Sequence, residues 1–200
     1  MIVHYLIYSH YYLVHSVMLK YDHNQYISEK ILIPLGLKNT FFPITEVNLN
    51  DVMSGYYVGH EEDFKAREYG MLATAEDVGI FLRALNDGSV FDQGEKQIYP
   101  YEYNHGGLVV GYQSLAEYHK DIDAVVVQFI NTTDFNGYEW NLSEITINRI
   151  VKILRKSNMD DEEGENAGYV ELWASDFDAG SFHHCDYLNM YLLFLHRSIW

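Results

Sequence analysis

The stretch YQSLAEYHKDIDAVVVQFI, residues 112–130, decides the fold class of this 200-residue chain. Residues 112–118 and 124–130 have strand-like patterns, and the polar segment 119–123 joins them as a turn. The run AVVVQFI is almost continuously apolar, which is typical of a strand that is buried on both faces. We therefore expect an antiparallel hairpin whose second strand lies inside the protein.

The clearest helical pattern in the chain covers residues 74–88. Thr74 suits the N-cap and is followed by two acids in the first turn, which favour the positive end of the helix dipole. Gly88 suits a left-handed C-cap and ends the pattern. The apolar residues at helical spacing, which we expect to be buried, are Val78, Phe81, Leu82 and Leu85.

Weaker helical patterns lie on either side of these two elements. Residues 140–154 return to helical spacing after the hairpin. Before it, residues 13–18 and 26–32 have apolar faces, and the sequence Pro34-Leu35-Gly36 is expected to stop the second of them. This order of elements predicts an α+β fold in which helices pack on an antiparallel sheet.

The composition indicates a folded, acidic protein. The hydrophobic fraction is 48%, which argues against a wholly disordered chain. The formal net charge of −16 would repel a phosphate backbone, so we expect no nucleic-acid partner. No segment reaches the roughly 18 apolar residues of a membrane span. The single cysteine, Cys185, excludes an intrachain disulfide and a zinc site with two or more thiolates.

The charge distribution divides the chain. Residues 158–200 carry nine acids and one base. The polar run 157–167 has no periodicity, and such a run cannot bury enough surface to offset the entropy of ordering it. We therefore predict a partial domain over residues 1–156, an acidic linker over 157–167 and a separate C-terminal tail over 168–200.

General catalytic and cofactor motifs are absent from the sequence. It has no glycine-rich phosphate loop, no Gly-x-Ser-x-Gly and no His-Glu-x-x-His. His183, His184 and Cys185 are adjacent, but neighbouring residues point in different directions, so at most two of them could share a metal. We expect no metal and no organic cofactor, and a metal-binding protein built around these three residues stays a third, weaker alternative.

A series of short segments goes further than these general motifs. They are Tyr8-Ser9-His10, Tyr26-Ile27 with Ile31–Thr40 (ILIPLGLKNT), Ser54-Gly55-Tyr56-Tyr57, Gly70–Val78 (GMLATAEDV), His105-Gly106-Gly107, Gly111-Tyr112-Gln113-Ser114 and the strand that ends in Asn131-Thr132-Thr133. In this order they resemble the C-terminal two thirds of the β-lactamase-related serine hydrolases, a family of class C β-lactamases, DD-peptidases, other penicillin-binding proteins and esterases. The resemblance covers residues 5–155 and implies a β-lactamase/transpeptidase-like fold.

In that family a serine in a Ser-x-x-Lys motif attacks a carbonyl and forms an acyl-enzyme, and a Tyr-x-Asn motif and a Lys-Thr-Gly or His-x-Gly strand line the other walls. The resemblance implies that Tyr8 helps to move the serine proton and that His105 is the cationic or hydrogen-bonding residue of the strand. A phenol has a pKa of about 10, so Tyr8 could do this only beside positive charge. Tyr5, Tyr11 and Tyr12 are alternatives for the same role.

The resemblance also implies four substrate-binding residues. Gly106 and Gly107 have no Cβ and would let a substrate backbone approach closely. The backbone N–H of Leu108 would be one of two oxyanion donors. His10 stands where the family has asparagine, and because imidazole cannot reproduce the paired donor and acceptor of an amide, its role stays open.

The motif that would carry the nucleophile is missing. No serine in the sequence is followed by lysine three positions later. In the family this motif lies upstream of Tyr-x-Asn, so the resemblance implies that the opening helix and first strands of the fold are missing from this chain. Removing the serine nucleophile of a serine protease costs about six orders of magnitude in turnover. We therefore expect a hydrolase domain that is inactive on its own.

The missing strands would leave the hairpin of residues 112–130 with an uncovered apolar face and edge, which favours self-association. The tail offers a cover, because it holds an apolar cluster: Tyr187, Leu188, Met190, Tyr191, Leu192, Leu193 and Phe194.

The expected ligand is a small molecule or peptide with an ester, amide or lactam group. A rival interpretation is a non-catalytic peptide- or ester-binding module, or a degenerate remnant of the enzyme. The resemblance favours a periplasmic or secreted protein, while the chain itself carries no localisation signal that we recognise.

Overall fold

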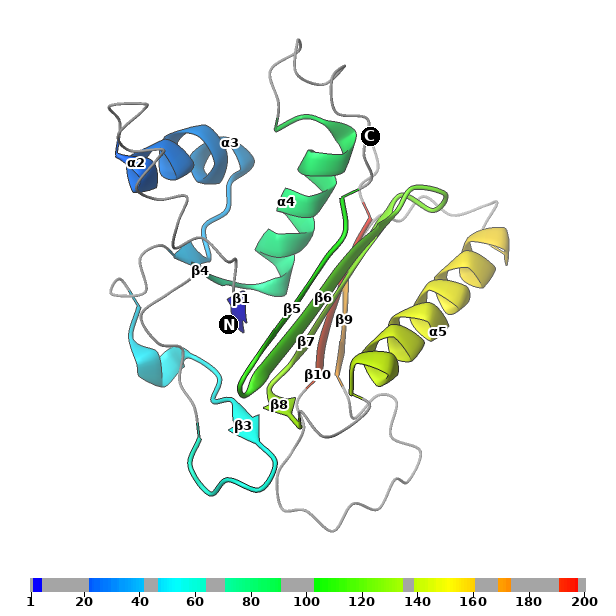
Figure 1. Cartoon of the computed structure of the whole chain (residues 1–200). Coiled ribbons are helices and arrows are strands. Elements are labelled where there is room, and N and C mark those ends of the chain that lie inside the picture. The colour runs from blue at the N-terminus through cyan, green and yellow to red at the C-terminus, as the bar shows by residue number, and fades with distance from the viewer. Residues whose placement is uncertain are drawn as a thin grey trace.

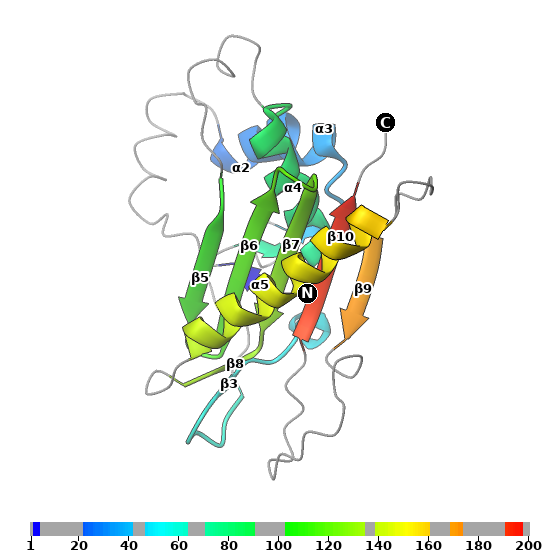
Figure 2. The ribbon, with the colours of Figure 1, turned by 90° about the vertical axis from the view of Figure 1, so that its right-hand side faces the viewer.

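The main sheet has five antiparallel strands in the order β5-β6-β7-β10-β9. The computed structural model describes residues 2–4, 22–41, 47–63, 71–90, 103–134, 139–160, 169–173 and 191–197. The strands are β5 (His105–Val109), β6 (Tyr112–His119), β7 (Ala124–Ile130), β9 (Tyr169–Trp173) and β10 (Tyr191–Arg197). Helix α4 (Ala75–Asp87) lies on one face of the sheet and helix α5 (Glu139–Asp160) lies on the other (Figure 1, Figure 2). The predicted α+β layout is thereby confirmed.

The predicted hairpin is strands β6 and β7. They pair from Gln113↔Ile130 to His119↔Ala124. All of β7 is buried, as the continuous apolar run predicted. Asp123 closes the turn with a positive φ of 46°.

A polar cluster fixes this turn to α4. The Arg83 guanidinium donates to Asp123 from Nη2 at 2.7 Å and from Nε at 3.2 Å. The Tyr118 hydroxyl donates to the same carboxylate at 3.0 Å. Burial, together with the bond of its own hydroxyl to Asp123, raises the pKa of Tyr118 above its usual value. The hairpin is therefore held at its turn as well as along its strands.

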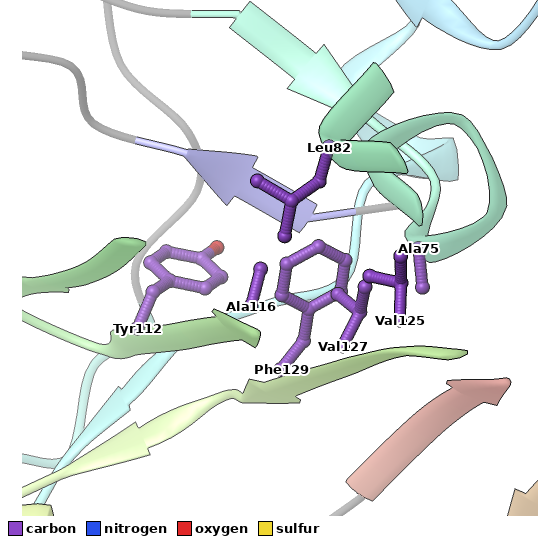
Figure 3. Packing of buried hydrophobic residues seen from close by; sticks show 7 residues of the cluster. All are labelled: Ala75, Leu82, Tyr112, Ala116, Val125, Val127 and Phe129. Atoms are coloured by element: carbon purple, nitrogen blue, oxygen red, sulfur yellow. The ribbon is translucent and has the colours of Figure 1, made fainter. Parts of the chain in front are cut away.

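Two apolar clusters sandwich the sheet. On the α4 side the buried members come from α4, β6 and β7: Ala75, Leu82, Tyr112, Ala116, Val125, Val127 and Phe129 (Figure 3). On the α5 side the buried members are Leu115, Val126, Ile147, Ile150 and Val151. Successive β7 residues alternate between the two clusters, as strand geometry requires. This alternation explains why the strand has no polar face.

Helix α4 has the predicted caps. The Thr74 side chain accepts the Asp77 N–H at 3.3 Å, and Gly88 has the left-handed φ of 79° that ends the helix. Asp77 is 3% exposed and accepts two further bonds, from the Asn39 N–H at 2.8 Å and the Thr40 hydroxyl at 2.7 Å. The acid in the first turn therefore also ties α4 to the preceding segment.

The C-terminal tail joins the main sheet by backbone pairing. Strand β10 pairs with β7 over seven residue pairs that include Tyr191↔Ile130, and β9 pairs with β10 in the register Leu192↔Trp173. The hypothesis that the tail covers the hairpin is confirmed for its edge, and an open edge at β7 was the wrong expectation. Self-association stays a prediction. Strands β5 and β9 form the two edges of the sheet, and among the described residues each pairs with one strand, which leaves an edge to which another chain could add.

A helical run, a short helix and two small sheets make up the rest of the described structure. The helical run comprises α2 (His23–Ile27), the π-helix η1 (Ser28–Leu32) and α3 (Ile33–Leu35). A three-stranded sheet has the order β1-β4-β2, made of β1 (Ile2–His4), β4 (Met71–Ala73) and β2 (Thr40–Phe41). The short helix η3 (Leu49–Asp51) precedes β3 (Tyr56–Tyr57), which pairs in parallel with β8 (Thr132–Thr133).

One predicted helix limit is confirmed and one was wrong. The first helical run ends within the predicted stop Pro34-Leu35-Gly36, with Gly36 as a left-handed cap at a φ of 68°. Helix α5 continues to Asp160, past the predicted end at residue 154 and into the predicted linker, because no glycine or proline interrupts it. The predicted helix over 13–18 and residues 161–167 of the linker lie outside the described residues.

Within the described parts of the chain, no helix is both long enough and apolar enough to cross a membrane.

Candidate functional site

Four of the six predicted site residues lie consecutively on β5: His105, Gly106, Gly107 and Leu108. Tyr8 and His10 lie outside the described residues, so their roles stay predictions. Strand β5 forms one edge of the main sheet and pairs with β6. Its other edge has no strand partner among the described residues.

Strand alternation distributes this motif over both faces of the sheet. His105 and Gly107 stand opposite Ala116 and Ser114, and Ala116 belongs to the α4-side cluster, so His105 and Gly107 belong to that side. Leu108 belongs to the other side and is 41% exposed. His105 is exposed as well. The two side chains of the motif therefore reach solvent on opposite sides of an edge strand whose middle residues have no Cβ.

Two asparagines hold the backbone just before His105. Asn86 of α4 donates from Nδ2 to the Tyr103 carbonyl at 2.9 Å, and its Oδ1 accepts the Tyr103 N–H at 2.7 Å. Asn104 accepts the Tyr118 N–H through Oδ1 at 2.7 Å. These bonds fix the start of β5 to α4 and to β6. A backbone that is held in this way can present His105 in one position, which recognition requires.

At the other end of β5 three segments of the resemblance meet. The Tyr56 N–H donates to the Asn131 carbonyl at 2.7 Å, and Asn131 donates from Nδ2 to the Ser54 carbonyl at 3.1 Å. The Gly111 N–H donates to Thr133 Oγ1 at 2.8 Å. We call the cluster formed by residues 53–58, 111–112 and 131–133 the turn joint. Its bonds are structural, since each satisfies a backbone group that would otherwise be unpaired.

Close packing at the turn joint requires glycine at two positions. A Cβ on Gly55 would lie 2.6 Å from the Gly111 carbonyl oxygen and 2.6 Å from a ring carbon of Tyr112. Gly111 has a φ of 84°, and a Cβ there would lie 3.0 Å from the backbone of Gly55. All three distances are shorter than ordinary van der Waals contact. The two glycines therefore let the β3 segment and the β5–β6 turn touch through their backbones.

Tyr112 is a structural residue of the same joint. Its hydroxyl donates to the Met53 carbonyl at 2.7 Å, and its ring is 3% exposed. Burial raises the pKa of this phenol to about 12. The hydroxyl therefore stays protonated at neutral pH and acts as a hydrogen-bond donor.

The described residues offer no group of three His, Cys, Asp or Glu side chains that is placed to hold a metal ion. The alternative metal site at His183, His184 and Cys185 lies outside them and stays untested.

The comparisons with known proteins support the fold through one solved structure. No protein-family model matches the sequence, and no curated protein matches it. One solved structure that is similar is the D-amino acid amidase from Ochrobactrum anthropi SV3, crystallised with D-phenylalanine, with a TM-score of 0.53 and 19% sequence identity. The alignment covers 70% of this chain and 57% of the amidase chain.

The fold is β-lactamase-like. The similarity to the amidase agrees with the predicted mixture of helices and antiparallel sheet. An identity of 19% establishes the fold and leaves activity and substrate as matters for proposal.

Sequence reasoning missed the two asparagines that position β5. Asn86 lies two residues before the glycine that ends α4, where its sequence context predicts only the end of a helix. Asn104 directly precedes His105, but nothing in the sequence indicates that its partner is Tyr118. Both bonds join residues far apart in the chain, so only the packed structure reveals them.

Proposed function

We propose that this chain carries the substrate-binding wall of a serine hydrolase that acts through an acyl-enzyme on an ester, amide or lactam. The observation that carries the proposal is edge strand β5, where His105 precedes two glycines on a backbone held by Asn86 and Asn104. An extended acyl group can approach such a backbone because no Cβ is in the way. Backbone N–H groups are also the usual donors that stabilise an oxyanion.

The same chain is expected to be catalytically inactive by itself. It contains no Ser-x-x-Lys, and the loss of a serine nucleophile lowers turnover by about 10⁶-fold in a serine protease. His105 could polarise or orient a carbonyl, but Ser114, on the same side of the sheet, is 4% exposed and is followed by Glu117 three positions later. Hydrolysis by the mechanism of this family would require a Ser-x-x-Lys motif, which these 200 residues do not contain.

The second candidate function is a binding module for peptides or esters. It is favoured by the combination of an open edge strand with the absence of the nucleophile motif. An extended peptide can add to such an edge through its backbone. The amidase with the similar fold was crystallised with D-phenylalanine, so D-amino acid amides and short D-peptides are the first ligands to test.

The experiment has a turnover arm and a binding arm. We expect the purified chain to leave nitrocefin, p-nitrophenyl acetate and D-phenylalaninamide unchanged beyond the blank rate. Turnover that disappears in His105→Ala and survives in the matched control His60→Ala, another exposed histidine, would contradict the proposed inactivity. Binding of an amide or ester that His105→Ala abolishes and His60→Ala preserves would support the substrate-binding wall.

A genomic measurement separates the two candidates. Sequencing the DNA upstream of the Met1 codon in all three frames will reveal whether a Ser-x-x-Lys segment is encoded there. Such a segment in frame would support the hydrolase. Its absence would favour the binding module.

A further inference from the structure

The outer face of α5 carries a row of bases on an otherwise acidic protein. Arg149, Lys152 and Lys156 recur at spacings of three and four residues, which places them on one side of the helix, and all three are exposed. The opposite side of α5, which includes Ile147 and Val151, packs on the sheet. We call the three exposed bases the basic stripe.

The charges of the basic stripe are not offset by the described part of the protein. The ion pair that α5 makes there uses a different residue, Arg155, whose Nε lies 2.6 Å from an Asp121 oxygen. No described carboxylate forms an ion pair with Arg149, Lys152 or Lys156. On a chain with a net charge of −16, three exposed bases that none of these ion pairs includes form a local surface of positive charge.

The helix dipole explains only part of this arrangement. Bases near a helix C-terminus are favourable, but the effect is confined to about the last turn. Helix α5 ends at Asp160, so Arg149 and Lys152 lie at least two turns before its end. The dipole therefore does not account for these two bases.

Exposed apolar side chains accompany the basic stripe. Ile145 and Ile153, on the same outward half of α5, are 46% and 60% exposed. Bases interleaved with exposed aliphatic residues on a helix surface are typical of contact with anionic lipid, where the bases meet headgroups and the aliphatic groups enter the interface. Among the described elements, α5 is the outermost layer on its face of the sheet (Figure 2). A single helix that lies on a sheet forms a ridge, which suits a planar membrane better than it suits a peptide that needs walls on both sides.

We propose that α5 docks on an anionic lipid bilayer surface through the basic stripe, with Ile145 and Ile153 entering the headgroup region. The proposal is independent of the function of β5. Each base near an anionic surface strengthens binding about fivefold, so three bases give weak, reversible and salt-sensitive binding. At about 0.15 M salt, charges more than about 8 Å apart are largely screened from each other. Acidic groups elsewhere in the chain that lie farther than this from the membrane therefore repel it only weakly when α5 faces it.

The first test uses the full chain and vesicles. At about 0.15 M salt, where the screening length is about 8 Å, we expect it to sediment with vesicles of equal parts phosphatidylcholine and phosphatidylglycerol and to remain in solution with pure phosphatidylcholine. Raising the salt to about 1 M, where the screening length is about 3 Å, should abolish binding. Equal binding to both vesicles, or binding to neither, would overturn the proposal.

A matched pair of double variants tests whether the stripe itself is responsible. Arg149→Gln with Lys152→Gln should weaken binding about 25-fold, given about fivefold for each base. Lys30→Gln with Lys38→Gln changes the net charge equally at exposed positions on η1 and after α3 and should change binding less than about twofold. Equal weakening by both pairs would mean a general charge effect and would overturn the assignment to α5.

Two further measurements exclude other occupants and misfolding. Binding to poly-glutamate or to duplex DNA without binding to anionic vesicles would assign the stripe to an acidic protein or a nucleic acid and would overturn the lipid proposal. Ile145→Ser with Ile153→Ser should also weaken vesicle binding while leaving the circular dichroism and thermal melt unchanged, since both side chains are largely exposed. Unchanged vesicle binding by this variant would contradict the insertion of the isoleucines.

Discussion

The two ends of β5 are held in different ways. At the turn joint, two glycines touch through their backbones and buried hydrogen bonds connect three segments. At the start of the strand, Asn86 and Asn104 fix the backbone, and the next side chain, His105, is exposed. Several of the motif residues thus stabilise the turn joint, whereas His105, the first of the residues proposed to meet a substrate, lies at the open end.

The largest expected effect is at the turn joint. Gly111→Ala should destabilise the fold by about 3 kcal/mol, because an alanine at positive φ is strained by about 1–2 kcal/mol and its Cβ also overpacks the joint. Gly59 has a similar φ of 87°, but nothing lies within 4 Å of the position of its Cβ, so Gly59→Ala should cost only the strain of about 1–2 kcal/mol. Urea unfolding of both variants measures the difference. Equal losses would show that the backbone contact at Gly111 is not tight.

The next effect tests the hydrogen bond that closes the turn joint. Thr133 is fully buried at 0% exposure, and Thr133→Val removes the acceptor of the Gly111 N–H while preserving the shape. The unpaired buried N–H should cost about 1–3 kcal/mol in the free energy of unfolding. Thr133→Ser keeps the hydroxyl and serves as the control. A loss in the serine variant as large as in the valine variant would assign the effect to packing.

The pH dependence of stability should report on the turn joint, where Tyr112 is buried, and not on the open end of β5. The fold raises the pKa of Tyr112 to about 12, above the usual value of about 10 for an unfolded tyrosine. The stability that this phenol contributes is therefore complete below about pH 10 and is lost as the pH rises through about 12. In urea titrations over that window, Tyr112→Phe should lose less stability than the wild type. Parallel curves for the two proteins would contradict the burial of this hydroxyl.

The smallest effect on stability is expected at the open end. His105→Ala removes an exposed side chain and should change the free energy of unfolding by less than about 0.5 kcal/mol. Asn86→Ala, in contrast, removes both bonds to Tyr103 and should cost about 1–2 kcal/mol. Thermal melts of the two variants compare exposed and positioning residues directly. A large loss in His105→Ala would assign this histidine to the fold.

The sequence was sufficient for elements whose evidence is local. The apolar run of β7 and the caps of α4 at Thr74 and Gly88 are visible in consecutive residues, and the structure confirms them. The end of α5 was misjudged because polar residues without glycine or proline are compatible with either a helix or a linker. The pairing of β10 with β7 depends on a contact across more than sixty residues, which periodicity cannot locate.

In the candidate site, too, the sequence indicates the part that is made of consecutive residues, and the role of these residues toward a ligand stays a prediction. The pattern His105-Gly106-Gly107 is continuous and marked β5 as an open strand that a ligand could approach. The residues that position this strand are dispersed, since Asn86 reaches Tyr103 across 17 positions and Asn104 reaches Tyr118 across 14. Side-chain to backbone bonds of this kind have no spacing rule. The sequence therefore indicates the residues of the candidate site more readily than those that hold its strand in place.

The measurement that tests the central claim most directly is an NMR titration of the full chain with N-acetyl-D-phenylalaninamide. If β5 is the substrate-binding wall and the chain lacks its nucleophile, amide resonances of residues 105–108 should shift, those of the turn joint should stay in place, and the amide should remain intact after prolonged incubation. Shifts elsewhere with none on β5, or release of ammonia from the amide, would contradict the account.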